Sequence, residues 1–454
     1  MKQTGYDMLY LTACAVNNIT PDSSCIALID PDELFKMCQY HSLTAIVCTA
    51  LESAGISNKK FIEAKLKAIR KNILLDSERK KICGTLEQYG IWYMPLKGTV
   101  LKELYPQTDV RQMSDNDILF DKTYRKTVLK IMKNLGYSAK YYGKGNHDVY
   151  IKPPIYNYEM HTELFHISYN EKWTEYYSQI KNKLIQDSNT EYGYHFTDED
   201  FYVYITAHEY KHYNISGTGL RSLLDRYIFL MHKEKILNWQ YIQNECKKLG
   251  IAQFEKQNRN LCKKVLSEPE LPRLSPEEKE LLEYHFSCGT YGTIENEITK
   301  RMEKFNYKTV SKTRFKYIFS RVFPSLEFYQ FNYPFFYRHK IFLPLIWFFR
   351  LAKVITIKRK YMKNLQRDCE TNMPGSKSAG IFTYCDFRLF GPEGLFEVAR
   401  KLGRYGYFAV GCFKFPYALA YKVQNLTVCR ASLVFGYICL LYTSPSPRDM
   451  RRSR

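Results

Sequence analysis

The sequence predicts an α/β (α+β) fold in which a small mixed β-sheet is flanked by N-terminal helices and followed by a C-terminal helical domain. Between residues 90 and 165, short apolar runs with alternating character are separated by glycine turns and short amphipathic segments. On both sides of this stretch, apolar residues recur at helical spacing. We therefore divide the chain into four parts: an N-terminal helical region (1–89), an α/β core (90–170), a helical domain (171–368) and a tail (369–454).

The N-terminal region is predicted to form two long helical stretches. Residues 30–55 carry apolar side chains at helical spacing, and Asp30 or Asp32 is placed to cap the first helix. Residues 59–89 form a Lys-rich amphipathic pattern that ends at Gly90.

The core is predicted to alternate strands and helices. IWYMPL (91–96) predicts a short buried strand, and TVLKELY (99–105) predicts a helix that stops at Pro106. A strand at 117–120 and a helix at 122–137 follow, and then three segments with strand-like alternation. The helical domain is predicted to contain helices at 199–213, 218–234, 238–249, 252–265 and 275–287.

Composition narrows the class of protein only in part. The net charge of +21 favours anionic partners, although Lys-rich solvated helices give the same excess. The 13 cysteines lack paired spacing and no signal peptide is evident, which predicts reduced thiols and a cytoplasmic location. The longest apolar stretch, 341–349, contains Pro344 and is too short to span a bilayer; it fits a buried helix or an interfacial one.

The end of the chain differs from the rest. Periodicity is lost after CETNMPGSKSAG (369–380), and the final residues 440–454 resemble a translated sequencing adapter. We expect 440–454 to be an artefact and treat 370–439 as a doubtful tail whose native origin stays open.

Two aspartates one residue apart are the strongest chemical signal. Asp115 and Asp117 project to the same side at the head of a predicted strand. Adjacent carboxylates repel unless a cation lies between them, and a pair of Mg²⁺ ions roughly 3.5–4 Å apart would supply one during phosphoryl or nucleotidyl transfer. Glu159, on a later predicted strand, is placed to be the third carboxylate.

A glycine turn precedes the aspartates. Gly98 would let the backbone approach phosphate at a helix start, and Lys97 and Arg111 could neutralise triphosphate charge. Lys97 fits a solvated surface lysine equally well, and Arg111 could pair instead with Asp109 or Asp115.

These segments resemble the uncharacterised nucleotidyltransferase family of the polymerase-beta-like nucleotidyltransferase superfamily. The similarity rests on GIWYMPLKGTVLKELYP (90–106) and VRQMSDNDILF (110–120), because a glycine turn and helix precede a D-x-D strand in that family. It begins upstream with DPDELFKMCQYHSLTAIVCTALESAGI and covers roughly residues 25–300. Lys97-Gly98-Thr99 stands where many superfamily members have Gly-Ser, and the gap to Asp115 is longer, which leaves the nucleotide specificity open.

The resemblance also assigns residues after the core. YEMHTEL matches an acid–apolar–His element, with Glu159 and His161 in the matching positions. AHEYKHYNISGTGLRSLLDRYIF matches a helical signature, on which four residues fall: His208, His212, Arg221 and Asp225. They would position substrate or hold the core against the helices, and Arg221 and Asp225 could equally form a helix ion pair.

The resemblance implies an enzyme that transfers a nucleoside monophosphate from an NTP, with Mg²⁺, to an acceptor that is a small molecule, a protein or RNA. Asp115, Asp117 and Glu159 would be catalytic and metal-binding, and the nucleotide would contact Lys97, Gly98, Thr99 and Arg111. An inactive nucleotide- or RNA-binding module is the alternative.

A second motif gives another alternative. His208-Glu209-Tyr210-Lys211-His212 spells H-E-x-x-H, the zinc-protease pattern, with both imidazoles on one helical face. Thr218 occupies the third-histidine position of the longer motif, and Glu234 is a distant candidate ligand. If the histidines serve the helical scaffold, Glu209 is a surface residue.

The tail generates one prediction. A chain that ends at residue 369 should fold and bind nucleotide as well as the full chain, because the tail lacks a consistent pattern. Soluble yield and NTP affinity of the two proteins measure this, and loss of soluble protein on truncation would show that 370–439 completes a core.

Overall fold

The computed structural model describes residues 2–107, 110–293, 296, 297, 300, 329, 333–339, 341 and 346. Met1–Glu297 form one compact unit, and the chain from Ile298 onward belongs to a second. A short helix, α17 (Pro334–Arg338), is described in the second unit. All features discussed below lie in the first unit.

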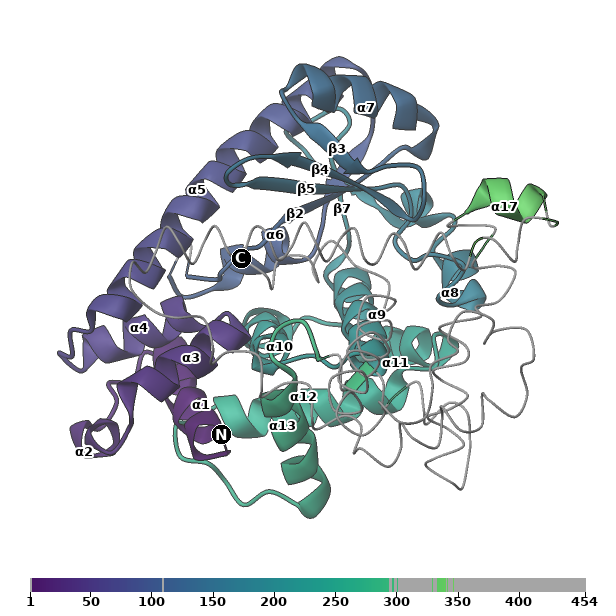
Figure 1. Cartoon of the computed structure of the whole chain (residues 1–454). Helices are drawn as coiled ribbons and strands as arrows, with labels where there is room; N and C mark the ends of the chain where they lie inside the picture. The colour runs from purple at the N-terminus through teal and green to yellow at the C-terminus, as the bar shows by residue number, and fades with distance from the viewer. Residues whose placement is uncertain are drawn as a thin grey trace, which may run out of the picture. The chain divides into compact units, whose positions relative to one another are not determined.

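The first unit contains a five-stranded mixed sheet with the order β1-β2-β5-β4-β3 (Figure 1). Neighbouring strands are antiparallel except β2 and β5, which run parallel. The strands are β1 (Tyr93–Pro95), β2 (Asn116–Phe120), β3 (Ser138–Tyr141), β4 (His147–Lys152) and β5 (Tyr156–His161). A two-stranded ribbon, β6 (Ile185–Gln186) and β7 (Tyr194–His195), adjoins the sheet where Tyr93 N–H donates to the Tyr192 carbonyl.

Helices α5 (Lys59–Gln88) and α7 (Arg125–Asn134) cover one face of the sheet. In Figure 1, α5 runs beside the sheet from α4 up to α7. The apolar side chains at this interface come from alternate strand positions, so their neighbours along each strand project to the opposite face. They include Ile118, Phe120, Tyr150, Tyr158 and Met160.

The remaining helices share a second apolar core, to which both the N-terminal helices and those after the sheet contribute. α1 packs on α4 and α12, and α10 packs on α12. The helices are α1 (Lys2–Val16), α2 (Ser23–Ala27), α3 (Pro31–His41), α4 (Thr44–Ser53), α6 (Gly98–Leu101), α8 (Glu171–Tyr176), α9 (Asp198–Ile215), α10 (Leu220–Lys233), α11 (Trp239–Lys248), α12 (Ala252–Leu266) and α13 (Pro276–Cys288), with the 3₁₀ turns η1 (Lys102–Leu104), η2 (Lys122–Tyr124) and η3 (Ile180–Lys183).

The predicted fold class is confirmed, and the predicted strands and helices of residues 90–288 occur in their predicted order. Residues 30–55 form two helices rather than one, because Ser42 adopts a left-handed conformation at the end of α3. Asp30 is the cap, accepting from the Asp32 and Glu33 amides. The division at residues 89, 170 and 368 stays a prediction.

No helix among the described residues is long and apolar enough to cross a membrane. Most of the apolar stretch 341–349 and the whole of the tail from residue 369 lie outside the described residues.

Candidate functional site

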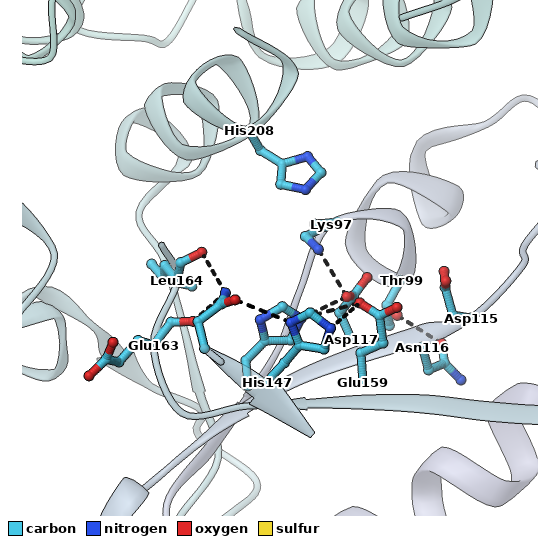
Figure 2. Close-up of polar contacts among 12 residues, drawn as sticks. Lys97, Thr99, Asp115, Asn116, Asp117, His147, Glu159, Glu163, Leu164 and His208 are labelled. Carbon is cyan, nitrogen blue, oxygen red and sulfur yellow. Dashed lines mark hydrogen bonds and ion pairs between the residues drawn. The ribbon is translucent and has the colours of Figure 1, made fainter. Parts of the chain in front are cut away.

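The parallel pairing of β2 with β5 creates the site. Its register sets Asp117 beside Glu159 and Leu119 beside His161, on the face opposite α5 and α7. β4 adds His147, which is paired with His161 in the β4–β5 register. The polar side chains of three neighbouring strands therefore meet on one face (Figure 2).

The three predicted carboxylates are buried on this face. Asp115 is 7% exposed, Asp117 5% and Glu159 4%, so bulk water does little to screen their charges. A buried carboxylate needs a cation or hydrogen-bond donors to stay ionised. The contacts of each one therefore indicate what the site is built to hold.

Asp117 accepts hydrogen bonds from a lysine and from a histidine. Lys97 Nζ lies 2.9 Å from its Oδ1, and His161 Nε2 lies 2.8 Å from the same oxygen. Lys97 belongs to the turn between β1 and α6 and has a positive φ of 51°. The turn after β1 thus aims its lysine at the strand that carries the aspartates (Figure 2).

Glu159 faces two imidazoles. Its Oε2 lies 3.7 Å from His147 Nε2 and 3.8 Å from His161 Nε2. Burial lowers the pKa of both histidines, and the neighbouring Lys97 lowers each of these pKa values further. Both rings are therefore neutral at neutral pH.

Asp115 precedes β2, and only one of its two carboxylate oxygens has a hydrogen-bond partner among the described residues. Its Oδ1 accepts a hydrogen bond from the Ser114 hydroxyl at 2.9 Å, whereas its Oδ2 is buried without a hydrogen-bond partner among the described residues. An ionised oxygen in this situation is costly, and a cation bound there would remove the cost.

The loop that carries Asp115 is fixed by α10. Arg111 forms two 2.7 Å hydrogen bonds to the Asp225 carboxylate, and the Tyr105 hydroxyl donates to the same carboxylate at 2.7 Å. Burial alone would raise the pKa of Asp225, but the Arg111 guanidinium outweighs it and lowers this pKa. Arg221 adds a 3.2 Å hydrogen bond to the Gln112 carbonyl.

This arrangement changes the interpretation of several predicted residues. Arg111 is engaged by Asp225, not by Asp115, and no ion pair between Arg221 and Asp225 occurs in the described structure. The open side of Gly98 is filled by protein, because an added Cβ would lie 2.4 Å from Arg111 Nη1. The Thr99 hydroxyl donates to Asn116 Oδ1 at 3.0 Å. The predicted nucleotide contacts of Arg111, Gly98 and Thr99 stay predictions.

Helix α9 lies across the site from the sheet. Figure 2 shows the His208 ring projecting from α9 toward Lys97 and the carboxylates. His212 lies one turn later, with its Nε2 3.2 Å from that of His208. His208 therefore projects toward the carboxylates from the side opposite the sheet, and a ligand contact of either histidine stays a prediction.

The expectation that Glu209 is a surface residue is wrong. Glu209 is buried and forms an ion pair with Arg226, itself buried between α9 and α10. Arg226 also donates to the Tyr202 and Thr206 hydroxyls. Glu234 pairs with Lys263 at 2.7 Å. Among the described residues, the side chains that lie close enough together to hold a metal ion are those of His147, Glu159 and His161. Within this part of the chain, His208 and His212 therefore lack the third protein ligand that a zinc protease requires.

Sequence reasoning missed His147 and its neighbour Asn146. His147 is the first residue of β4 and of the strand that the sequence predicts at 147–151, and Asn146 precedes it. Their place in the site depends on the pairing of β4 with β5. The available signal was a polar residue at the first position of a predicted strand.

Comparison with known proteins gives one match. The family described as "Uncharacterised nucleotidyltransferase" matches residues 27–267, which is more than half of the chain. No curated protein and no solved structure matches.

The buried ion pair on α9 generates a stability prediction. Glu209→Gln should lower the free energy of unfolding by about 3 kcal/mol, because it leaves the Arg226 charge buried without a counter-ion. The matched control, Glu234→Gln, removes a more exposed pair and should cost less than about 1 kcal/mol. Urea denaturation measures both, and equal losses would mean that Arg226 does not depend on Glu209.

Proposed function

Because the chain belongs to the uncharacterised nucleotidyltransferase family, we propose that it transfers a nucleoside monophosphate from an NTP to an acceptor. An acceptor oxygen would attack the α-phosphorus, the bond to the β-phosphate would break, and pyrophosphate would leave. The observation that carries this proposal is the pairing of Asp117 with Glu159 across parallel strands, with Asp115 two residues before Asp117.

We propose that Asp115, Asp117 and Glu159 hold Mg²⁺. All three offer hard oxygen ligands, which Mg²⁺ prefers. The buried, unpartnered Oδ2 of Asp115 and the close approach of Lys97 to Asp117 support this, since both indicate a site with excess negative charge. When bound, Mg²⁺ would neutralise phosphate charge and orient the reacting oxygens.

Lys97 would exchange one partner for another. In the structure its Nζ pairs with Asp117 Oδ1 at 2.9 Å. If a cation took over the charge of Asp117, the Lys97 ammonium would be available to a phosphate group of the NTP. Of the three residues in the Lys97-Gly98-Thr99 turn, Lys97 is therefore the one that we propose contacts the nucleotide.

The remaining residues would act around this centre. Glu159 would ligate metal or take the acceptor proton, and His208 and His212 of α9 would contact the nucleotide or the acceptor. Arg111, held by Asp225, would position the loop that carries Asp115 instead of contacting phosphate. A cytoplasmic location remains part of the proposal.

The carboxylates generate the main test of this function. Wild-type protein incubated with each labelled NTP, Mg²⁺ and cell extract should label an acceptor, which can then be identified. Asp115→Asn and Asp117→Asn should each lower this transfer by about 100-fold or more, because each removes a charged metal ligand. Asp121→Asn is the matched control, because Asp121 caps the 3₁₀ turn after β2 and Asn can cap it as well.

The same two variants should differ in thermal stability. Asp115→Asn should keep or raise the melting temperature, because it removes an ionised oxygen that has no partner. Asp117→Asn should lower it, because Lys97 and His161 lose their acceptor charge. Unchanged transfer in both variants would contradict the proposal, and nucleotide binding without transfer in the wild type would favour an inactive binding module.

A further inference from the structure

The histidines beside the carboxylates are unexpected in an all-oxygen Mg²⁺ site. His147, His161 and Glu159 each offer one ligand atom, and these atoms lie within 4.8 Å of one another. We propose that these three residues bind a divalent transition-metal ion of the Zn²⁺ class, a second ion beside the proposed Mg²⁺, with Glu159 shared between the two.

Asn146 determines which nitrogen of His147 is available. The Asn146 Nδ2 donates to the Glu163 and Leu164 carbonyls, at 3.1 and 3.3 Å, so its Oδ1 is left as an acceptor. His147 Nδ1 lies 3.3 Å from that Oδ1, and this contact favours the tautomer that carries the ring proton on Nδ1. His147 Nε2 is then an unprotonated lone-pair donor.

That lone pair faces a carboxylate. Glu159 Oε2 lies 3.7 Å from His147 Nε2. A divalent ion between the two atoms would be bound by both of them. A metal-bound histidine whose other ring nitrogen donates to an amide oxygen is the usual outer-shell pattern of metal sites.

His161 completes the set from the neighbouring strand. Its ring centroid lies 4.9 Å from that of His147, and its Nε2 lies 3.8 Å from the same Glu159 oxygen. Its Nε2 proton is donated to Asp117. On binding, the ion would take the place of this proton, which would move to Nδ1, a buried nitrogen without a hydrogen-bond partner among the described residues, so that the ring stays neutral.

The distances suit a small ion after a modest contraction. Zn²⁺ bound at about 2.0–2.2 Å to tetrahedral ligands separates those ligands by about 3.3–3.5 Å. The observed separations of 3.7 and 3.8 Å are a few tenths of an ångström longer.

The donor set also selects the metal. Two imidazoles with one carboxylate suit Zn²⁺ and similar ions, whereas Mg²⁺ prefers oxygen. Three protein ligands leave one position open, which is typical of catalytic and not structural zinc. If the proposed transfer holds, an ion held by these residues would supply Lewis-acid chemistry that lowers the pKa of the acceptor hydroxyl.

Metal binding itself tests the inference, without any transfer assay. The full-length protein, stripped of metal, is titrated with Zn²⁺ by calorimetry, and with Co²⁺ while its visible d–d absorption is recorded. One equivalent should bind, with Co²⁺ bands typical of a low-coordinate nitrogen and oxygen site. His147→Gln should raise the Zn²⁺ Kd by about 100-fold or more, beyond the about 10–100-fold that loss of an outer-shell partner costs.

Three controls separate the possible results. His195→Gln changes an exposed histidine paired with Asp187, and His212→Gln changes the α9 pair; both should bind Zn²⁺ as the wild type does. Asp115→Asn should lose transfer and keep Zn²⁺ binding, which distinguishes failure of the two proposals. If His147→Gln retains wild-type affinity and Co²⁺ bands while its melting curve is native, or if His212→Gln loses binding instead, the inference is overturned.

Discussion

Buried negative charge is the constraint on which the site depends. Asp115, Asp117 and Glu159 lie together on one face of the sheet, each less than a tenth exposed. A sheet face covered by protein is a poor place for three carboxylates unless cations compensate them, because charges interact strongly where water is excluded. Lys97 pairs with Asp117, but Asp115 keeps a buried oxygen without a partner among the described residues. This excess charge is the basis of the proposed metal–triphosphate site.

The surrounding helices hold these carboxylates in place. α5 and α7 fill the opposite face of the sheet with apolar side chains, which fixes the alternation that directs Asp117 and Glu159 to the site. α10 binds the loop before β2 through Asp225 and Arg111, and Arg226 of the same helix is joined to Glu209 of α9. Asp225 of the helical signature therefore acts on the site loop through its ion pair with Arg111. Within the H-E-x-x-H pattern, Glu209 is explained by helix packing, and His208 projects toward the site.

Much of the fold could be predicted from local patterns, and the site only in part. Strand and helix positions follow from alternation, glycine turns and helical spacing, which are local properties. The sequence also placed Asp117 and Glu159 on strands, since both belong to short apolar runs. It could not reveal their parallel register, nor the antiparallel return of β4 that adds His147. The Arg111–Asp225 pair joins residues 114 positions apart, and no local pattern distinguishes it from a pair with Asp109 or Asp115.

The central claim is that the buried carboxylates bind a divalent cation that carries the triphosphate. The most direct measurement is the equilibrium affinity for a non-hydrolysable NTP, by calorimetry, with Mg²⁺ and with a chelator, in the wild type and in Asp117→Asn. The account predicts that Mg²⁺ tightens wild-type binding by about tenfold or more, equivalent to about 1.4 kcal/mol, and that this gain disappears in Asp117→Asn. Equal NTP affinity with and without Mg²⁺ in the wild type, or an undiminished gain in Asp117→Asn, would contradict it.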